Sequence, residues 1–317
     1  MSDRFDILTG DCREMLQTIP DASVQCCVTS PPYWGLRDYG HPDQIGNEPT
    51  PEQYVDNLLT VFREVRRVLR DNGTLWLNLG DSYSSTGGSR PNGSSDGHLG
   101  RGNPPIAGSR KAVRKPKDLI GVPWLVAFAL QSDGWWLRQD IIWAKPNPMP
   151  ESVTDRCTKS HEYVFLMSKS DRYYYDQDAI KEGATSEKGK GATGRGKQES
   201  AAAVGCNGRQ PQQDHSGWIG GNGETRNRRS VWTITTKPYA GAHFATMPPQ
   251  LAETCVLAGS KPGDLILDPF GGSGTTAAVA LKHDRLALII ELNPKYVQLV
   301  NGRIRSITDA LDQPKMF

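Results

Sequence analysis

The chain has 317 residues, of which 37% are hydrophobic, and a formal net charge of +2 at pH 7. This length suits one large domain, or one domain that carries a smaller inserted part. The apolar residues come in short runs broken by charges, far below the roughly 20 needed to cross a bilayer, so we expect no membrane partner. The first residues also lack the basic and apolar regions of a secretory signal.

The thiol and imidazole side chains show no spacing typical of a metal site. The six cysteines contain no Cys-x-x-Cys pair, and together with the six histidines they give no zinc-binding pattern. We therefore expect no metal, and we expect reduced thiols in a cytoplasm.

Positive charge is concentrated in two segments. Residues 84–117 contain seven basic side chains against one acid, and residues 182–230 contain eight against five, which leaves the remainder acidic. Both segments are rich in Gly, Ser, Asn and Gln, and have too few apolar residues to offset the entropy of ordering. Either one alone reads as a solvated linker. Two basic segments in an otherwise well-packed chain predict arms that order on a polyanion.

The first part of the chain reads as strand, helix and strand. Residues 5–8 form a short apolar run, 12–19 have helical spacing, and 24–28 have the pattern of a buried strand. Thr50-Pro51-Glu52-Gln53 then predicts a capped helix start, and apolar residues recur at helical spacing until Asn72-Gly73, where we expect the helix to stop.

The middle of the chain predicts further strands and one helix. Residues 74–79, 137–143 and 162–167 read as strands, the last with an antiparallel neighbour at 173–175, and residues 119–130 read as a helix.

A strand, turn, helix and strand follow near the C-terminus. Residues 264–267 read as a strand, 268–274 as a glycine-rich turn, 275–281 as a helix and 286–290 as a strand that ends at Glu291. Alternating strands and helices predict an α/β fold with a mostly parallel sheet covered on both faces. Its ligands should bind at the carboxyl ends of the strands.

The glycine-rich turn predicts a cofactor that contains adenosine. Gly272-Ser273-Gly274-Thr275-Thr276-Ala277 fits the pattern G-x-G-x-x-A between a strand and a helix. Glycines let the backbone approach a ligand, and the helix N-terminus offers free N–H groups. Glu291, which ends the next strand, is placed to accept both ribose hydroxyls. No Lys follows the glycines, which argues against a Walker phosphate site. A tight turn without a ligand is the alternative.

A second motif, Ser30-Pro31-Pro32-Tyr33-Trp34, follows the buried strand 24–28. Alone it predicts only a stiff turn. At this edge of the sheet the prolines hold the Ser30 hydroxyl and the Pro31 carbonyl as fixed acceptors, with no proline N–H to compete. Two acceptors suit the exocyclic amine of a base, because hydrogen bonds to both its hydrogens would aim the nitrogen lone pair at an electrophile. Tyr33, with Trp34, would stack on that base.

The two motifs in this order, with a long variable middle, resemble the amino-methyltransferases of DNA of the permuted beta class. The resemblance runs from Gly10-Asp11 to about Arg305. It implies a Rossmann-like methyltransferase fold, circularly permuted so that the catalytic half comes first and the cofactor half last, with long inserted loops. The halves would be residues 1–181 and 231–317, with a target-recognition region at 182–230. The implied cofactor is S-adenosylmethionine and the implied partner is double-stranded DNA.

The resemblance also assigns individual residues. Glu291 would hold the ribose hydroxyls, Asp11 would reach the adenine amino group, and Thr275 with Thr276 would lie at the cofactor carboxylate. The remaining cofactor contacts are expected from Phe244, Asp268, Pro269, Phe270, Gly272, Ser273, Gly274 and Asn293. Trp143 and Asn147 would lie near the base, and His161 is expected to be structural. DNA contacts are expected from Arg110, Lys111, Arg114 and Lys115 in the first arm and from Arg226, Arg228 and Arg229 in the recognition region.

Several alternatives stay open at this stage. A nicotinamide-dependent oxidoreductase would share the glycine turn but would leave the Ser-Pro-Pro-Tyr motif without a role, and a catalytically silent DNA-binding protein would leave both motifs unused. RNA or protein is a further alternative as the methyl acceptor, because related motifs with Asn in place of Ser30 act on amines of those molecules. The resemblance associates Ser30 more often with N4 of cytosine and Asp at this position with N6 of adenine, which favours cytosine only slightly. We expect a cytoplasmic, nucleoid-associated protein of prokaryotic or phage type, a homodimer, and a separate restriction nuclease as a possible companion.

Overall fold

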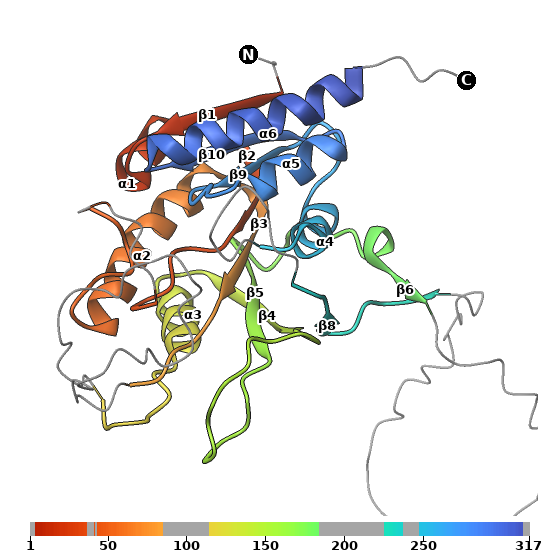
Figure 1. Cartoon of the computed structure of the whole chain (residues 1–317). Helices are drawn as coiled ribbons and strands as arrows, with labels where there is room; N and C mark the ends of the chain where they lie inside the picture. The colour runs from red at the N-terminus through yellow and green to blue at the C-terminus, as the bar shows by residue number, and fades with distance from the viewer. Residues whose placement is uncertain are drawn as a thin grey trace, which may run out of the picture. The chain divides into compact units, whose positions relative to one another are not determined.

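The computed structural model describes residues 4–36, 41, 43–84, 114–183, 225–236 and 247–312 (Figure 1). The chain divides into two compact units, one made of residues 1–176 and 229–317 and the other of residues 177–228. The first unit contains an eight-stranded sheet in the order β1-β10-β9-β2-β3-β5-β4-β8. Within the described residues no helix is long and apolar enough to span a membrane.

Five neighbouring strands of this sheet are parallel, as the sequence predicts. They are β1 (Phe5–Thr9), β10 (Leu286–Glu291), β9 (Leu265–Asp268), β2 (Val24–Thr29) and β3 (Leu69–Leu79). β5 (His161–Ser168) lies antiparallel between β3 and β4 (Trp136–Ala144), and β8 (Val231–Thr233) pairs parallel with β4. The chain order therefore places the first and the last segments of the fold side by side at β1 and β10, which is the permuted arrangement expected above.

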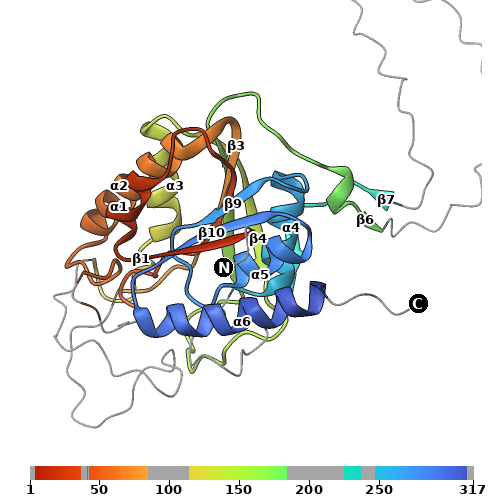
Figure 2. The same cartoon turned by 90° about the horizontal axis from the view of Figure 1, so that it is seen from above.

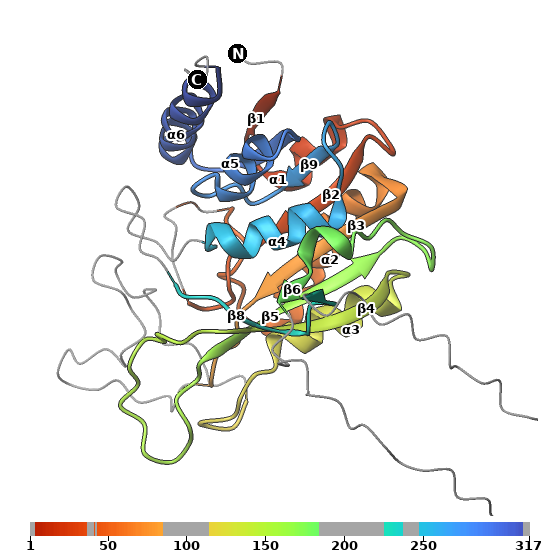
Figure 3. The same cartoon turned by 90° about the vertical axis from the view of Figure 1, so that its right-hand side faces the viewer.

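Helices cover both faces of the sheet. The helices on one face are α1 (Cys12–Met15), α2 (Pro51–Val68) and α3 (Val122–Ser132), and those on the other are α4 (Pro249–Gly259), α5 (Thr275–Lys282) and α6 (Pro294–Asp312). Figures 2 and 3 show the two groups on opposite sides of the strands. This arrangement is the doubly wound α/β architecture. Its switch point, where the strand order reverses, lies between β9 and β2.

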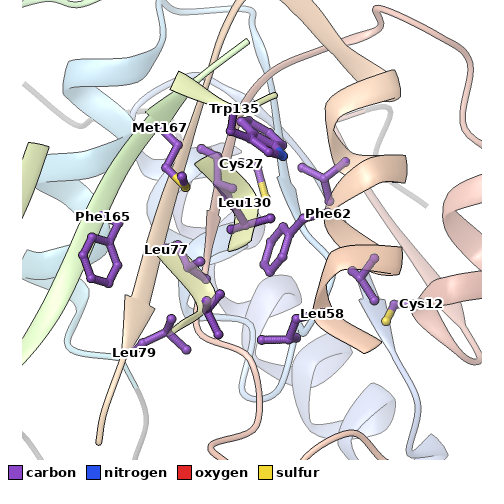
Figure 4. Packing of buried hydrophobic residues seen from close by; sticks show 14 of the residues in the cluster. Cys12, Cys27, Leu58, Phe62, Leu77, Leu79, Leu130, Trp135, Phe165 and Met167 are labelled. Atoms are coloured by element: carbon purple, nitrogen blue, oxygen red, sulfur yellow. The ribbon is translucent and has the colours of Figure 1, made fainter. Parts of the chain in front are cut away.

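The hydrophobic core lies between the sheet and the helices α1 to α3. Leu58 and Phe62 of α2 and Leu130 of α3 pack there against side chains from β2, β3 and β5 (Figure 4). Successive residues of a strand point to opposite faces, so Cys27 belongs to this core. Its neighbour Cys26 faces α4 instead, where a Cβ on Gly259 would lie only 2.6 Å from the Cys26 sulfur.

Helix α2 begins as predicted but ends earlier. The Thr50 side chain accepts a hydrogen bond from the Gln53 N–H at 3.2 Å, which caps the N-terminus. The stop expected at Asn72-Gly73 is wrong, because Leu69 already adopts an extended backbone and β3 runs from Leu69 through Gly73. A Cβ on Gly73 would lie 2.9 Å from the Arg70 carbonyl oxygen, so this strand requires a glycine there.

Other boundaries also differ from the sequence predictions. The first helix is shorter and continues as a 3-10 turn at Leu16–Thr18, and the helix expected at 119–130 begins at Val122 after Gly121, whose φ is +80°. The strand expected at 173–175 is absent from this described segment. Helices α4 and α6 were not predicted.

The second unit, residues 177–228, is described only at its two ends. It contains a 3-10 turn (Asp178–Ile180) and a short antiparallel pair of β6 (Glu182–Gly183) with β7 (Thr225–Arg226). Arg226 donates from Nε to Glu182 Oε1 at 2.8 Å and so joins the two strands. Most of the region predicted to recognise the target lies outside the described residues.

Candidate functional site at the carboxyl edge of the sheet

The carboxyl ends of β1, β10, β9 and β2 lie along one edge of the sheet, and the strand order reverses between β9 and β2. Asp268 ends β9, Glu291 ends β10, Gly10 follows β1, and Ser30 follows β2. Parallel α/β sheets bind their ligands in the crevice at this point. Both sequence motifs therefore reach one edge of the same sheet, although 239 positions separate Thr29 from Asp268.

Glu291 holds the glycine-rich turn through both carboxylate oxygens. Its Oε2 accepts the Gly272 N–H at 2.8 Å, and its Oε1 accepts the Asn293 N–H at 2.8 Å. A carboxylate has about four acceptor sites, so two remain for the hydroxyls of a bound ribose. Burial raises the pKa of Glu291, and the two N–H groups oppose this shift. Asn293 in turn caps α6, because its Oδ1 accepts the Lys295 N–H.

The two glycines of the turn have different surroundings. A Cβ on Gly272, which has a φ of +51°, would meet only the Phe270 carbonyl oxygen at 3.7 Å, so this side of the turn is open to a ligand. A Cβ on Gly274, with a φ of +69°, would lie 2.8 Å from the Val300 side chain of α6. Gly274 thus allows close helix packing, whereas Gly272 leaves space at the site.

Helix α5 begins at this turn. Its first residues are buried, and Thr276 Oγ1 donates to the Val28 carbonyl of β2 at 3.2 Å. Arg303 of α6 donates to the Ser273 carbonyl at 2.8 Å and to Thr275 Oγ1 at 3.1 Å. Sequence reasoning missed Arg303, since only the docking of α6 brings a residue 28 positions away to the turn.

Asp11 lies at the rim of a cavity of about 450 Å³ between the ends of β1 and β10. Its carboxylate caps α1 by accepting the Arg13 N–H at 2.8 Å and forms an ion pair with the Arg13 guanidinium. Burial opposes ionisation, but these hydrogen bonds hold the pKa of Asp11 below its ordinary value. The cavity is lined by Gly10, Asp11, Arg13, Glu14, His41, Asp43 and Leu292.

A direct hydrogen bond joins the two motifs. The Thr29 hydroxyl at the end of β2 donates to Asp268 Oδ1 at 2.6 Å, and both side chains are buried. The same oxygen accepts the Phe270 N–H at 3.1 Å. Burial raises the pKa of Asp268, and the hydrogen bond from Thr29 is the largest opposing effect. Pro269 is buried beside Asp268.

A hydrogen bond from helix α2 fixes the loop after β2. Tyr54 of α2 donates from its hydroxyl to the Pro32 carbonyl at 2.9 Å. Among the described residues the Pro31 carbonyl has no hydrogen-bond partner, so it stays available to a ligand beside the Ser30 hydroxyl. Pro31 itself is buried, and Ser30 is half-buried.

Tyr33 directs its hydroxyl into the protein. Its Oη lies 2.7 Å from Glu162 Oε2, 3.2 Å from Asn78 Oδ1 and 3.3 Å from Ser30 Oγ. Burial raises the pKa of Tyr33 well above its ordinary value of 10.0, and the nearby Glu162 adds to the shift. Sequence reasoning missed Asn78, and it gave Glu162 no role, because both reach the site only through strand pairing of β3 and β5.

The expectation that Trp34 stacks on a base is wrong for this structure. Its indole is 7% exposed and belongs to the main core, and its Nε1 donates to the Glu48 carbonyl at 2.9 Å. Burial of the indole removes a large apolar surface from water, and its N–H finds an acceptor inside the protein.

Trp143 and Asn147, expected near the base, both contact the segment after β8. Trp143 donates from Nε1 to the Ile234 carbonyl at 2.8 Å, and Asn147 exchanges two hydrogen bonds of 3.1 Å with the Thr236 backbone. Lys145 between them lies 4.4 Å from the Trp143 ring and forms an ion pair with Glu162. Burial lowers the pKa of His161, and Lys159 lowers it further.

The basic arms are described only in part. Arg110, Lys111 and Phe244 lie outside the described residues. Arg114 forms an ion pair with Glu52, and Lys115 is exposed. Arg229 is also exposed, while Arg226 and Arg228 are half-buried. Within the described part of the chain no group of His, Cys, Asp and Glu could hold a metal ion.

Comparison with known proteins identifies the family. The profile described as DNA methylase matches residues 24–302. The chain belongs to the DNA methylase family. It is 46% identical to the type II methyltransferase M.Cfr9I of Citrobacter freundii, covering 94% of this chain and 87% of the relative, and 48% identical to M.SmaI of Serratia marcescens, covering 94% and 90%.

Solved structures of DNA methylases share this fold. One is a protein of Thermus thermophilus assigned as a DNA modification methylase and complexed with S-adenosyl-L-methionine. It is 26% identical with a TM-score of 0.58, covering 96% of this chain and 94% of that one. The cytosine-N4-specific PvuII DNA methyltransferase has a TM-score of 0.64 at 19% identity, covering 98% and 92%, and so supports the fold alone.

Proposed function

We propose that this DNA methylase transfers a methyl group from S-adenosylmethionine to N4 of cytosine in double-stranded DNA. The observation that carries the proposal is the contact between the two motifs. The Thr29–Asp268 hydrogen bond fixes the acceptor loop against the cofactor turn, so the Ser30 hydroxyl lies at the edge where the methyl donor binds. An oxidoreductase would leave this arrangement without a purpose.

The residues at this edge fit the methyl donor. Glu291 has acceptor sites left for ribose hydroxyls, and Gly272 leaves open space beside the turn. The cavity beside Asp11 has room for the adenine, whose amino group would donate to a carboxylate that Arg13 already orients. The bound donor supplies an electrophilic methyl group on a sulfonium.

Ser30 and Pro31 prepare the nucleophile. The two hydrogens of the target amine donate to Ser30 Oγ and to the Pro31 carbonyl, which the proline rings hold in place. With both hydrogens bound, the nitrogen becomes pyramidal and its lone pair points toward the donor, so the acceptors act mainly in the transition state. A strong base is not needed, because the methylated amine loses its extra proton afterwards.

The choice of cytosine N4 rests on Ser30. The resemblance associates serine at this position with cytosine more often than with adenine. Tyr33 does not distinguish the two bases, because an aromatic ring stacks on a pyrimidine and on a purine. Buried polar contacts to the flipped base would then select the ring.

Nucleoside analysis tests both the transfer of a methyl group to an amino group and the choice of cytosine N4. Unmethylated genomic DNA is incubated with the purified chain and S-adenosylmethionine, digested to nucleosides and separated by mass and retention. N4-methylcytosine is the expected product. N6-methyladenine would replace the proposed target and keep the chemistry, whereas 5-methylcytosine or an unmodified digest would contradict amino-group transfer. Mapping the modified sites in the same DNA gives the recognition sequence.

The assembly stays a prediction. Helix α3 and the start of β4 expose Leu125, Phe128 and Trp136, which is consistent with the expected homodimer. Light scattering at micromolar concentration should give twice the 34.8 kDa of one chain, and the mass of a single chain would contradict the dimer. We also propose that residues 182–230 recognise the target sequence and that a separate restriction nuclease accompanies the protein.

A further inference from the structure

A serine that accepts hydrogen bonds from an amine must place its own hydrogen elsewhere. A hydroxyl carries one donor and two acceptor lone pairs, whereas an ionised carboxylate only accepts. If the Ser30 hydrogen pointed at the target nitrogen, it would occupy the lone pair that attacks the methyl group. The proposed chemistry therefore depends on the direction of the Ser30 hydroxyl.

Tyr33 is the neighbour that can take this hydrogen. Its Oη lies 3.3 Å from Ser30 Oγ, in a geometry in which Ser30 donates. Tyr33 has one hydrogen of its own, and Glu162 Oε2 at 2.7 Å is the nearer acceptor for it, with Asn78 Oδ1 at 3.2 Å. Hydrogen bonds to a carboxylate are the shorter and stronger ones.

The orientation of Asn78 excludes a competing donor toward Tyr33. The Asn78 amide nitrogen donates to Glu162 Oε2 at 3.2 Å and to the Tyr163 carbonyl at 3.1 Å. The two acceptors fix which side of the amide is nitrogen, so its oxygen faces Tyr33. Both neighbours of Tyr33 inside the protein thus accept its hydrogen, and its lone pair is left for Ser30.

The rest of the surroundings keeps this chain of hydrogen bonds in place. Lys145 forms an ion pair with the other oxygen of Glu162. A Cβ on Gly80 would lie 2.5 Å from the Tyr33 ring, so the ring rests directly on the backbone at the end of β3. Burial raises the pKa of Tyr33 well above 10.0, so the phenol keeps the hydrogen that it donates.

We propose that Glu162, acting through Tyr33, orients the Ser30 hydroxyl so that both Ser30 lone pairs face the target amine. Glu162, Asn78 and the Tyr33 hydroxyl are then positioning groups rather than groups that touch the reacting atoms. This inference rests on the proposed function of the site. It assigns the Tyr33 hydroxyl a role that the stacking of its ring does not require.

The experiment is a double-mutant cycle of Tyr33→Phe and Glu162→Gln, read as single-turnover methyl transfer with saturating cofactor and DNA. Tyr33→Phe keeps the ring and removes only the hydroxyl, and Glu162→Gln keeps the shape and removes the charge. Each should lower the rate about tenfold to a hundredfold, the range expected for a hydrogen bond to a charged group. Because both act on one chain of hydrogen bonds, the double variant should be no slower than the slower single variant.

Matched controls separate positioning from loss of the fold. Glu253 of α4 is partly exposed and bonds to His283, which follows α5. Glu253→Gln should keep the parental rate. In Tyr33→Phe the cofactor affinity measured by calorimetry should stay near the parental value. The free energy of unfolding should fall, because buried partners of the hydroxyl lose a hydrogen bond, and the variant should remain folded at the assay temperature. A Ser30→Asp background gives the decisive contrast, because an ionised carboxylate only accepts hydrogen bonds and needs no neighbour to direct a hydrogen away from the amine. There Tyr33→Phe should change the remaining rate less than about twofold.

Three results would overturn the inference. They are a Tyr33→Phe rate within about twofold of the parent, independent effects that multiply in the double variant, and an equal loss from Tyr33→Phe in the Ser30→Asp background. The last comparison remains available if Glu162→Gln does not fold. A parent that transfers no methyl group would instead contradict the proposed function itself, and the inference with it.

Discussion

The cofactor side and the acceptor side of the site are built in different ways. On the cofactor side, Glu291 binds backbone N–H groups of residues 272 and 293, close to it in sequence or on the adjoining turn. On the acceptor side, Ser30 depends on side chains of Tyr33, Asn78 and Glu162 from three separate segments. Backbone donors hold a turn whatever the neighbouring side chains are, whereas a chain of side-chain hydrogen bonds fails when one member is lost.

This difference separates binding from chemistry. The cofactor side needs a fixed shape with spare acceptors, which a turn and one carboxylate provide. The acceptor side needs hydrogen bonds with a defined direction, which only particular side chains provide. Variants on the first side should therefore change cofactor affinity, and variants on the second should change the rate.

The largest effect is expected from Ser30→Ala. It removes an acceptor that acts mainly in the transition state, and the loss of such a group costs roughly 2.7–4 kcal/mol, or about a hundredfold to a thousandfold in rate. Single-turnover kinetics measure the loss, while calorimetry should give nearly unchanged cofactor affinity. A rate within about tenfold of the parent would show that Ser30 is not the acceptor.

Glu291→Gln should have the next largest effect, on affinity rather than rate. Glutamine offers one acceptor oxygen, and its NH2 group would face the N–H of either Gly272 or Asn293. We expect the dissociation constant for S-adenosylmethionine to rise about tenfold to a hundredfold. Glu253→Gln is the matched control. An unchanged dissociation constant in Glu291→Gln would show that Glu291, at the end of β10, does not bind the ribose.

The same contrast explains which parts the sequence could predict. The Gly272 turn, Glu291 and the strand before Ser30 are local patterns, and the structure contains them where the pattern predicts. The Thr29–Asp268 contact spans 239 positions and the Tyr33–Glu162 contact spans 129, so no local pattern marks either pair. Trp34 shows the same limit, since a tryptophan in an exposed-looking loop is a core residue in the structure.

Thr29→Val tests the contact that joins the two sides. Valine keeps the shape of the buried side chain but leaves Asp268 Oδ1 with only the Phe270 N–H. We expect the free energy of unfolding to fall by about 1–3 kcal/mol, because a buried carboxyl group loses one of its hydrogen bonds. Urea unfolding measures it, and Thr60→Val on the exposed face of α2 should cost far less. An equal fall in the free energy of unfolding in Thr29→Val and Thr60→Val would show that the Thr29–Asp268 hydrogen bond does not stabilise the fold.

Asp268 should also make stability depend on pH in a defined direction. Burial raises its pKa above the ordinary 3.8, so between 3.8 and the raised value the folded chain binds more protons than the unfolded chain. The free energy of unfolding contributed by this group therefore falls as pH rises through that window. Asp268→Asn should remove this fall, whereas Asp71→Asn, at a side chain 97% exposed, should keep it. A parental slope in Asp268→Asn would contradict the assignment.

The smallest effect is expected on the surface, at the described end of the first basic arm. Arg114 is paired with Glu52 and Lys115 is exposed, so replacing both with Gln should leave the fold and the methyl-transfer step unchanged. If both side chains contact phosphates, DNA affinity should fall for every sequence, and the slope of log affinity against log salt should flatten by up to about 2. Arg63→Gln removes an exposed guanidinium on α2 that is paired with Asp133, and it provides the control. A double variant whose salt slope equals that of the control would assign this segment to a linker and leave DNA binding to other residues.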